Sequence, residues 1–315
     1  MVPVGFYQCL IIMIYDYMSE EYFPVFYILL DCKLQKVYEI ALEHVKRAAP
    51  KLKLTTVTAD FEIGLDNALM LAFVGVVFIG CLFHWKQAVR RRLIAIGFSK
   101  DTVTFMIGEN GVMNLLTTVD PAEIREGIRY CRSKVDEVSE QSKWDSFWGE
   151  YFWDTWCVRY SISDWNVFAI HLNPAISLLN RTNNPLERFN RRYKVAFPKG
   201  TKPSLTSYVS TILQISDDVL SELALIRTGA VRSHKHAPAT LYDIPDDYPL
   251  PPLFDSDDTI LALAAAVLPA PVAVAPAIAA LSASVPVVVP LAPVVNGRYG
   301  PRGPYKKKVT VAGNV

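Results

Sequence analysis

The first third of the chain alternates strand-like and helix-like segments, and this order limits the folds that it can adopt. Two apolar runs rich in β-branched and aromatic residues are separated by a short polar segment, which predicts an antiparallel pair of strands. The predicted order is strand 6–15, strand 22–30, helix 34–49, strand 54–58, helix 63–73 and strand-like run 76–83. Such a mixture favours an α/β fold in which helices pack on a central sheet.

From His84 to about Trp165 the hydrophobic pattern turns helical and stays helical. Segment 142–160 is rich in aromatic residues, which we expect to pack in a core between helices. A surface on which nucleic-acid bases stack is the alternative interpretation of these rings. Further helices are predicted over 184–196 and 204–225.

These segments divide the chain into four expected regions. They are 1–83 as the sheet half of a core, 84–180 as a helical insertion, 181–232 as C-terminal helices of the core, and 233–315 as a low-complexity, disordered tail. Within the tail, segment 260–295 has no charged residue and is interrupted by six prolines. Proline-broken backbone is costly in lipid, so we expect no membrane partner. A membrane-tethered α/β protein is the less favoured alternative.

The overall charge and the cysteines bear on partners and compartment. The net charge of +1 gives no global field that favours nucleic acid, so any DNA contact must come from local basic patches. The five cysteines are scattered and odd in number. This pattern favours reduced thiols, as in a cytosolic or nuclear protein, over a disulfide framework.

Two acidic residues are candidates for a metal-binding or catalytic site. Asp60 stands at the exit of the predicted strand 54–58, where it can bind a metal ion or cap the helix that follows. Glu187 is the one acid in the asparagine-rich, basic segment 180–194. It can also bind a metal ion, or it can complete a capping box that begins at Asn184.

A Cys-x-x-His pair and two basic clusters complete the set of candidate residues. Cys81 and His84 have the spacing of half a zinc site, but four ligands are normal for structural zinc, and no second Cys/His pair stands nearby in the sequence. Cationic side chains that can contact DNA phosphates form two groups. The first group is Lys86, Arg90, Arg91 and Arg92, and the second is Arg181, Arg188, Arg191, Arg192, Lys194, Lys199 and Lys202. Of these we expect seven to bind DNA: Arg90, Arg91, Arg92, Arg188, Arg191, Arg192 and Lys194. Solvated surface faces are the alternative for both.

Taken together, segments 56–93 and 180–194 resemble the catalytic domain of Mutator-like element (MULE) transposases. The resemblance spans about residues 2–225. It implies a ribonuclease-H-like mixed sheet with a helical insertion, an Asp-Asp-Glu site for Mg²⁺ or Mn²⁺, and cleavage and transfer of DNA strands. Asp60 and Glu187 match the second and third catalytic, metal-binding carboxylates of the family. Cys81 and His84 match its signature, which implies that His84 lies near the processed DNA strand.

The same resemblance implies that the first catalytic aspartate is missing. In the family it belongs to an Asp-Gly-Thr-like motif just before the segment that corresponds to Met1, and no Asp-Gly-Thr occurs in this sequence. Asp16 and Asp31 fall at strand ends, away from the expected position. We therefore expect an N-terminally truncated domain whose sheet lacks its centre or has an exposed edge, and whose metal affinity is mostly lost.

The expected function follows from these departures. It is a nuclear, transposase-derived domain without catalytic activity, with DNA at transposon ends as partner and homo-oligomerisation left open. The alternative is a domesticated transposase that binds DNA, or regulates transcription, without catalysis. A truncated gene model of an intact transposase is a further reading of the same sequence.

Overall fold

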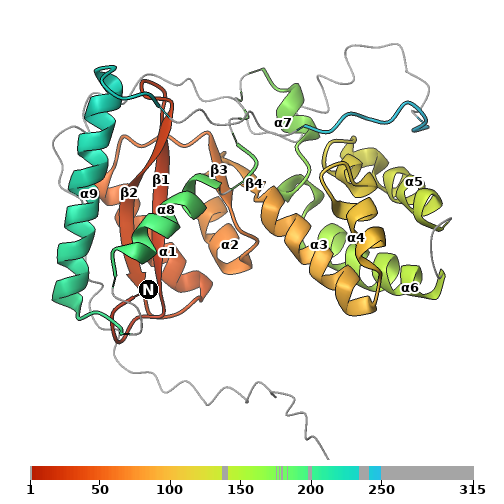
Figure 1. Cartoon of the computed structure of the whole chain (residues 1–315), viewed down its shortest axis with the longest axis horizontal. Helices are drawn as coiled ribbons and strands as arrows, with labels where there is room; N and C mark the ends of the chain where they lie inside the picture. Colours follow the sequence, from red (N-terminus) through yellow and green to blue (C-terminus); the bar gives the residue numbers. More distant parts are fainter. Residues whose placement is uncertain are drawn as a thin grey trace, which may run out of the picture.

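The computed structural model describes residues 2–136, 141–174, 176, 178, 180–182, 184–197, 201–233 and 241–249. The chain is mixed α/β, with two small sheets and a larger share of helix (Figure 1). This agrees with the α/β class predicted from the order of elements. No helix in the described part combines the length and the apolar character that crossing a bilayer requires. The expected tail from residue 250 onward lies outside the described residues.

The first sheet is the predicted hairpin of β1 (Gln8–Asp16) and β2 (Glu21–Leu30). Its register shifts between Ile12 and Met13, opposite Pro24. Proline has no N–H to donate to the ladder, and a β-bulge accommodates it. Residues of odd number on β1 pack against α8 (Asn184–Val195) and α9 (Leu205–Arg227), and residues of even number pack in the core with α1 (Gln35–Ala48). The hairpin is therefore covered on both faces.

The second sheet is the parallel pair of β3 (Thr56–Ala59) and β4 (Val77–Gly80), joined through α2 (Ile63–Ala72). The two strands are in register from Thr56 opposite Val77 to Ala59 opposite Gly80, so their carboxyl ends coincide. The sequence predicts a longer run to residue 83. Strand β4 ends earlier because the chain turns at Cys81 into helix α3 (Leu82–Ile96).

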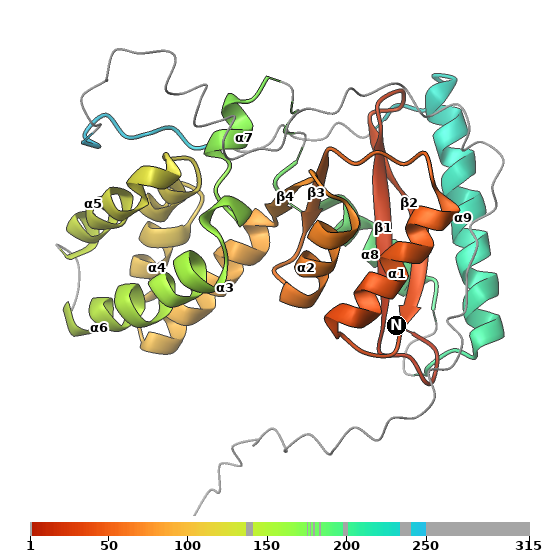
Figure 2. The same cartoon turned by 180° about the vertical axis from the view of Figure 1, so that it is seen from behind.

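The two strand pairs lie next to one another in the order β4, β3, β1, β2, which Figures 1 and 2 show from opposite sides. Within the described residues each pair forms its own two-stranded sheet. The buried carboxylate of Asp16 ties the hairpin to α9, since one of its oxygens lies 2.9 Å from the Arg227 guanidinium. Burial acts to raise the Asp16 pKa, but the hydrogen bond from the Ser19 hydroxyl and the Arg227 guanidinium outweigh it and hold the pKa below its usual value. Asp16 thus forms a structural ion pair with Arg227 at the end of β1.

The helical region is built around α3, whose buried residues Leu82, Trp85, Val89 and Leu93 recur at helical spacing. The helix ends at Gly97, whose φ of 97° is a left-handed conformation that favours glycine. Next come α4 (Lys100–Ile107), α5 (Ile124–Asp136), α6 (Gln141–Asp145), η3 (Ser146–Arg159), which is a π-type helix, and α7 (Phe168–Leu172).

The aromatic residues of 142–160 form the core of this region, as predicted. Their buried members are Trp144, Phe147, Trp148, Phe152 and Trp156. Base stacking is therefore not the role of these five rings. Segment 241–249 departs from the expected tail, because it packs on the same region. Tyr248 is buried, and the Tyr130 hydroxyl donates a hydrogen bond of 2.6 Å to Asp247.

Candidate functional site

The carboxyl ends of the parallel strands bring Asp60 and Cys81 together. Asp60 is the first residue after β3, and Cys81 is the first after β4. The Cys81 N–H donates a 2.9 Å hydrogen bond to the Ala59 carbonyl, so the ladder continues one step beyond the paired residues. In open α/β sheets, this edge is where ligands bind.

The start of α3 adds His84 to these two residues. Cys81 is the N-cap residue and has an extended backbone, and His84 follows in the first helical turn. Residues three apart lie on the same side of a helix, so the Cys-x-x-His spacing aims both side chains at one place. The sequence predicted the pair but not its proximity to Asp60.

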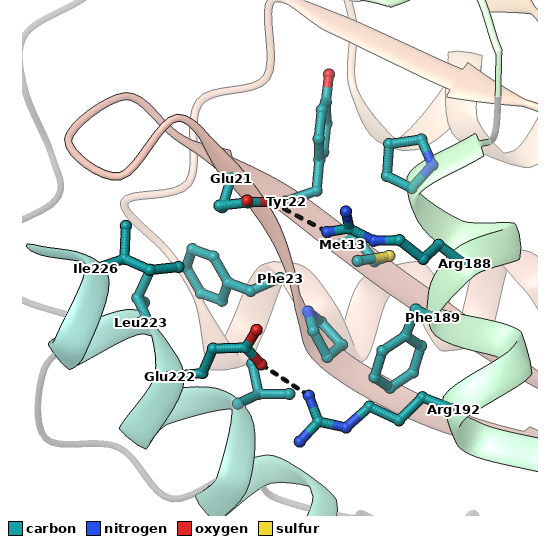
Figure 3. Close-up of a pocket in the computed structure, with 13 residues that line it drawn as sticks. Met13, Glu21, Tyr22, Phe23, Arg188, Phe189, Arg192, Glu222, Leu223 and Ile226 are labelled. Atoms are coloured by element: carbon teal, nitrogen blue, oxygen red, sulfur yellow. Dashed lines mark hydrogen bonds and ion pairs between the residues drawn. The ribbon is translucent and has the colours of Figure 1, made fainter. Parts of the chain in front are cut away.

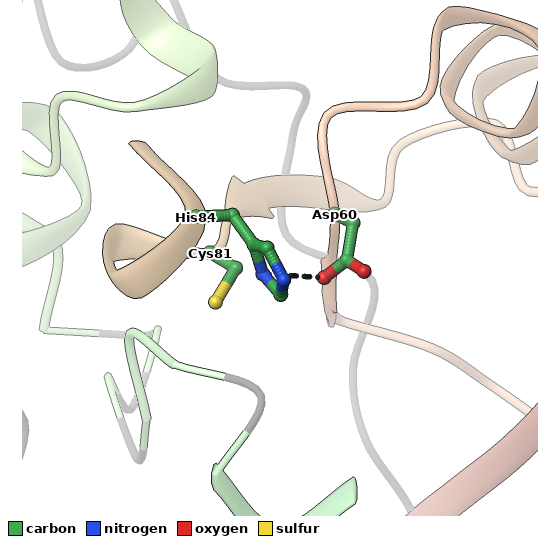
Figure 4. Close-up of side chains that lie close together, drawn as sticks. All are labelled: Asp60, Cys81 and His84. Atoms are coloured by element: carbon green, nitrogen blue, oxygen red, sulfur yellow. Dashed lines mark ion pairs between the residues drawn. The ribbon is translucent and has the colours of Figure 1, made fainter. Parts of the chain in front are cut away.

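Asp60, Cys81 and His84 form a compact group (Figure 4). One ligand atom from each residue lies within 4.8 Å of the other two. The closest pair is His84 Nδ1 and Asp60 Oδ1, at 2.9 Å. The Cys81 side chain is fully buried, whereas 52% of the Asp60 side chain and 30% of the His84 side chain are exposed. The group therefore has a closed sulfur side and an open carboxylate side.

The neighbours of His84 favour its charged form. The Asp60 carboxylate and then the Cys81 sulfur raise the pKa of His84 to about 10, against the opposing effect of burial. The imidazole is thus protonated at neutral pH when no cation is bound beside it.

Asp60 does not cap the helix that follows it. The N-cap residue of α2 is Glu62, whose side chain makes no capping hydrogen bond. Glu62 instead accepts a hydrogen bond from the Tyr38 hydroxyl and pairs with Lys33. The capping alternative for Asp60 is therefore wrong.

The loop that carries Asp60 is fixed by an aromatic clamp from the helical region. The Phe61 ring lies edge-on to Trp156 at 4.9 Å and to Tyr160 at 5.3 Å between centroids. The Tyr160 hydroxyl donates a 2.9 Å hydrogen bond to the Phe61 carbonyl. A side chain at Gly80 would overlap the Phe61 ring. Sequence reasoning missed this clamp, and the one signal for it is a glycine at the end of a β-branched strand.

Asp66, on α2, is the acid whose ionisation is most disfavoured near this site. Burial, followed by the charges of Asp164, Glu62 and Asp60, raises its pKa to about 8 from an ordinary 3.8. Asp66 therefore holds a proton at neutral pH. Its Oδ1 atom is buried and has no hydrogen-bond partner among the described residues.

Replacing Asp66 by asparagine should flatten the pH dependence of stability. Because the pKa in the folded state lies above the ordinary value, the stabilisation from the bound proton is complete below about pH 4 and is lost as the pH rises through 8. Asp66→Asn has no proton to lose, so at pH 8 it should be more stable than the wild type by about 1 kcal/mol or more. Urea unfolding at pH 4 and pH 8 measures the free energy of unfolding of both proteins. An equal change in this free energy between the two pH values would contradict the prediction.

Glu187 lies in the first turn of α8 and is not a member of the Asp60 group. Helix α8 packs on the β1–β2 hairpin through Phe189 and Tyr193. Helix α8 includes Asn184 as its first residue, one position earlier than a capping box that begins at Asn184 requires, so the capping alternative is not confirmed. The start of segment 180–194, which contains Glu187, does contact the start of α3 next to Cys81. The Leu82 N–H donates a 2.7 Å hydrogen bond to the Arg181 carbonyl. The Arg181 side chain is buried, which lowers its pKa to about 10.

Three of the seven predicted DNA-binding cations have partners inside the protein. Arg92 lies over the Tyr151 ring at 5.4 Å. Arg188 pairs with Glu21 at 3.2 Å, and Arg192 pairs with Glu222 at 2.9 Å. The last two pairs cross a pocket between the hairpin, α8 and α9 (Figure 3). Its cations are thus neutralised by acids, so this pocket does not suit phosphate.

The other four predicted DNA-binding cations are exposed: Arg90, Arg91, Arg191 and Lys194. The structure gives them no ion pair with another described residue. Two lie on α3, whose first turn carries His84, and two lie on α8. They therefore face solvent, where a phosphate can reach them.

Comparisons with known proteins leave the chain without an assigned family. No family model matches it, and searches of curated proteins and of solved structures give no significant match. The resemblance to MULE transposases therefore rests on the residues quoted above.

Proposed function

We propose that this chain derives from the catalytic domain of a MULE-type transposase and acts as a nuclear DNA-binding module that does not cleave DNA. The observation that carries the proposal is the contact between the two segments that resemble the family. They are far apart in the sequence, yet the backbone hydrogen bond from Leu82 to Arg181 joins them beside Asp60. A remnant of one site is expected to keep its two segments together.

The arrangement of strands supports this ancestry. A ribonuclease-H-like core described without the strand of its first aspartate should show a sheet without its centre. In this chain β1 and β3 are neighbours in the order of strands, yet each is hydrogen-bonded only to its own partner among the described strands. The proposal places the strand of the first aspartate, which this sequence does not include, between them.

The carboxylates near Asp60 support the absence of cleavage. Phosphoryl transfer with two hard divalent ions needs several ionised carboxylates directed at one point. Asp66 has a pKa of about 8 and is mostly protonated at neutral pH, and Glu62 is engaged by Tyr38 and Lys33. Glu187 is outside the group. In the described part of the chain, Asp60 is thus the remaining candidate for Mg²⁺ or Mn²⁺, and one carboxylate does not make the ancestral site.

The exposed cations provide the DNA contact of the proposal. Arg90 and Arg91 on α3, with Arg191 and Lys194 on α8, suit phosphate contacts, which give affinity without reading sequence. Recognition of transposon ends and self-association are parts of the proposal that depend on other surfaces. Control of transcription by a domesticated transposase is the role that this binding suits.

Removing two of these cations should weaken DNA binding and its dependence on salt. Each phosphate contact contributes about 0.9 to the slope of log K against log salt, so Arg90→Gln with Arg91→Gln should reduce the slope by about 2. Fluorescence anisotropy with a labelled duplex at several salt concentrations measures both effects. The matched control is Lys36→Gln with Arg47→Gln, which removes two exposed cations from α1. Equal losses in the two double variants would contradict the assignment.

A further inference from the structure

We propose that Asp60, Cys81 and His84 form a binding site for a divalent transition metal of the zinc class. This assignment rests on the geometry of the three side chains and holds whether or not the chain descends from a transposase. It differs from the Mg²⁺ or Mn²⁺ that the resemblance implies, and it adds a carboxylate that the Cys-x-x-His spacing alone did not reveal.

The three ligands are held by separate parts of a rigid framework. Asp60 stands at the end of β3, Cys81 at the end of β4 and His84 in the first turn of α3. The backbone hydrogen bond from Cys81 to Ala59 fixes the first two relative to each other. The bond from the Trp85 N–H to the Cys81 carbonyl, 3.0 Å, fixes the helical turn that carries the third. The site therefore does not depend on a long loop.

The spacing of the ligand atoms suits a shared ion. Ligands bound to zinc at its usual bond lengths in a tetrahedron are about 3.5 Å apart. The observed atoms lie within 4.8 Å of one another, and the closest two are 2.9 Å apart. Side-chain movements of about 1 Å bring all three to coordinating distance. Of the three side chains, that of Asp60 is the most exposed, at 52%.

The donor types select the metal. A thiolate, an imidazole and a carboxylate together suit zinc or cobalt, whereas magnesium prefers oxygen ligands alone. Burial of Cys81 shields the metal–sulfur bond from solvent. The exposed side of Asp60 and His84 leaves a fourth position for water, as in zinc sites with three protein ligands. Within the described residues, this is the one group of three such side chains close enough to share an ion.

Cobalt reports this site without any activity assay. After treatment with a chelator and its removal, the full chain is titrated with Co²⁺ and its absorption spectrum is recorded. We expect one equivalent to bind, with visible d–d bands and a thiolate-to-cobalt charge-transfer band, and Zn²⁺ to displace it where equal Mg²⁺ does not. Absence of the charge-transfer band, or displacement by Mg²⁺, would overturn the proposal.

Variants then test each ligand. Asp60→Asn and His84→Gln should weaken Co²⁺ binding at least tenfold, and Cys81→Ser should abolish the charge-transfer band. The matched controls are His44→Gln on α1 and Cys32→Ser, neither of which belongs to the group. Cys81 is buried, so circular dichroism first checks that the Cys81→Ser variant folds. If it does not fold, Asp60→Asn still tests the site, because the Asp60 side chain is exposed and its replacement should leave the fold intact. Equal affinity in Asp60→Asn and the wild type, or an equal loss in His44→Gln, would overturn the assignment.

Discussion

Trp156→Ala is expected to lower the free energy of unfolding by about 3–5 kcal/mol, the usual cost of removing a large buried aromatic side chain. Trp156 is 2% exposed. Its ring meets Phe61 at 4.9 Å, Tyr160 at 5.2 Å and Trp85 at 6.2 Å between centroids. The cavity left by the ring would therefore lie between the helical region and the loop that carries Asp60.

Urea unfolding monitored by circular dichroism measures this loss. The matched control is Val158→Ala on the same helix, because Val158 is 67% exposed and should lose less than about 0.5 kcal/mol. If Trp156→Ala were no more destabilising than Val158→Ala, the helical core would not be packed as described.

Gly80→Ala is the second change with a large expected effect. An added Cβ would overlap the Phe61 ring and lie 2.5 Å from the backbone oxygen of Asp164. The ring can rotate away, but the carbonyl belongs to the backbone and moves only with its segment. Overpacking of this kind typically costs 1–3 kcal/mol, and here it also pushes Phe61 and therefore the adjacent Asp60.

Gly149→Ala is the matched control for Gly80→Ala. Gly149 lies in the π-type helix η3, and a Cβ added there meets no atom within 4 Å. Alanine restricts the unfolded chain more than glycine does, so this change should be neutral or stabilising by up to about 1 kcal/mol. Thermal unfolding of both variants compares them directly. Equal melting temperatures would show that the site tolerates a side chain at Gly80.

The sequence predicted the elements well where the hydrophobic period was clear. Strands 6–15 and 22–30 correspond to β1 and β2, and helices 34–49 and 204–225 correspond to α1 and α9. The packing of the aromatic residues in 142–160 was also predicted, because large rings gain most from burial. The α/β class followed from the order of these elements.

The residues that form the site were harder to predict from the sequence. Cys81 falls in an apolar run that reads as strand to residue 83, and tertiary context ends the strand at Gly80. The meeting of Asp60 with Cys81 depends on the parallel register of β3 and β4, which no local pattern specifies. The docking of 241–249 depends on Tyr242 and Tyr248, two aromatics in an otherwise acidic, proline-rich stretch.

The two proposals fit together chemically. A transition metal that binds Asp60, Cys81 and His84 occupies the carboxylate at the strand ends that we propose to be ancestral, and its ligands are unsuited to magnesium. A domain with such a site and exposed cations on α3 can bind DNA through its phosphates while lacking the two-metal chemistry of strand cleavage.

The most direct test of this account is Mn²⁺-dependent nicking of a supercoiled DNA duplex by the purified chain, measured beside Asp60→Asn and Glu187→Gln. DNA binding is measured on the same samples. We predict that the wild type binds DNA and leaves both strands intact, as do the two variants. Nicking by the wild type that is lost in both variants would contradict the account, because it would require a working carboxylate site that includes Asp60 and Glu187.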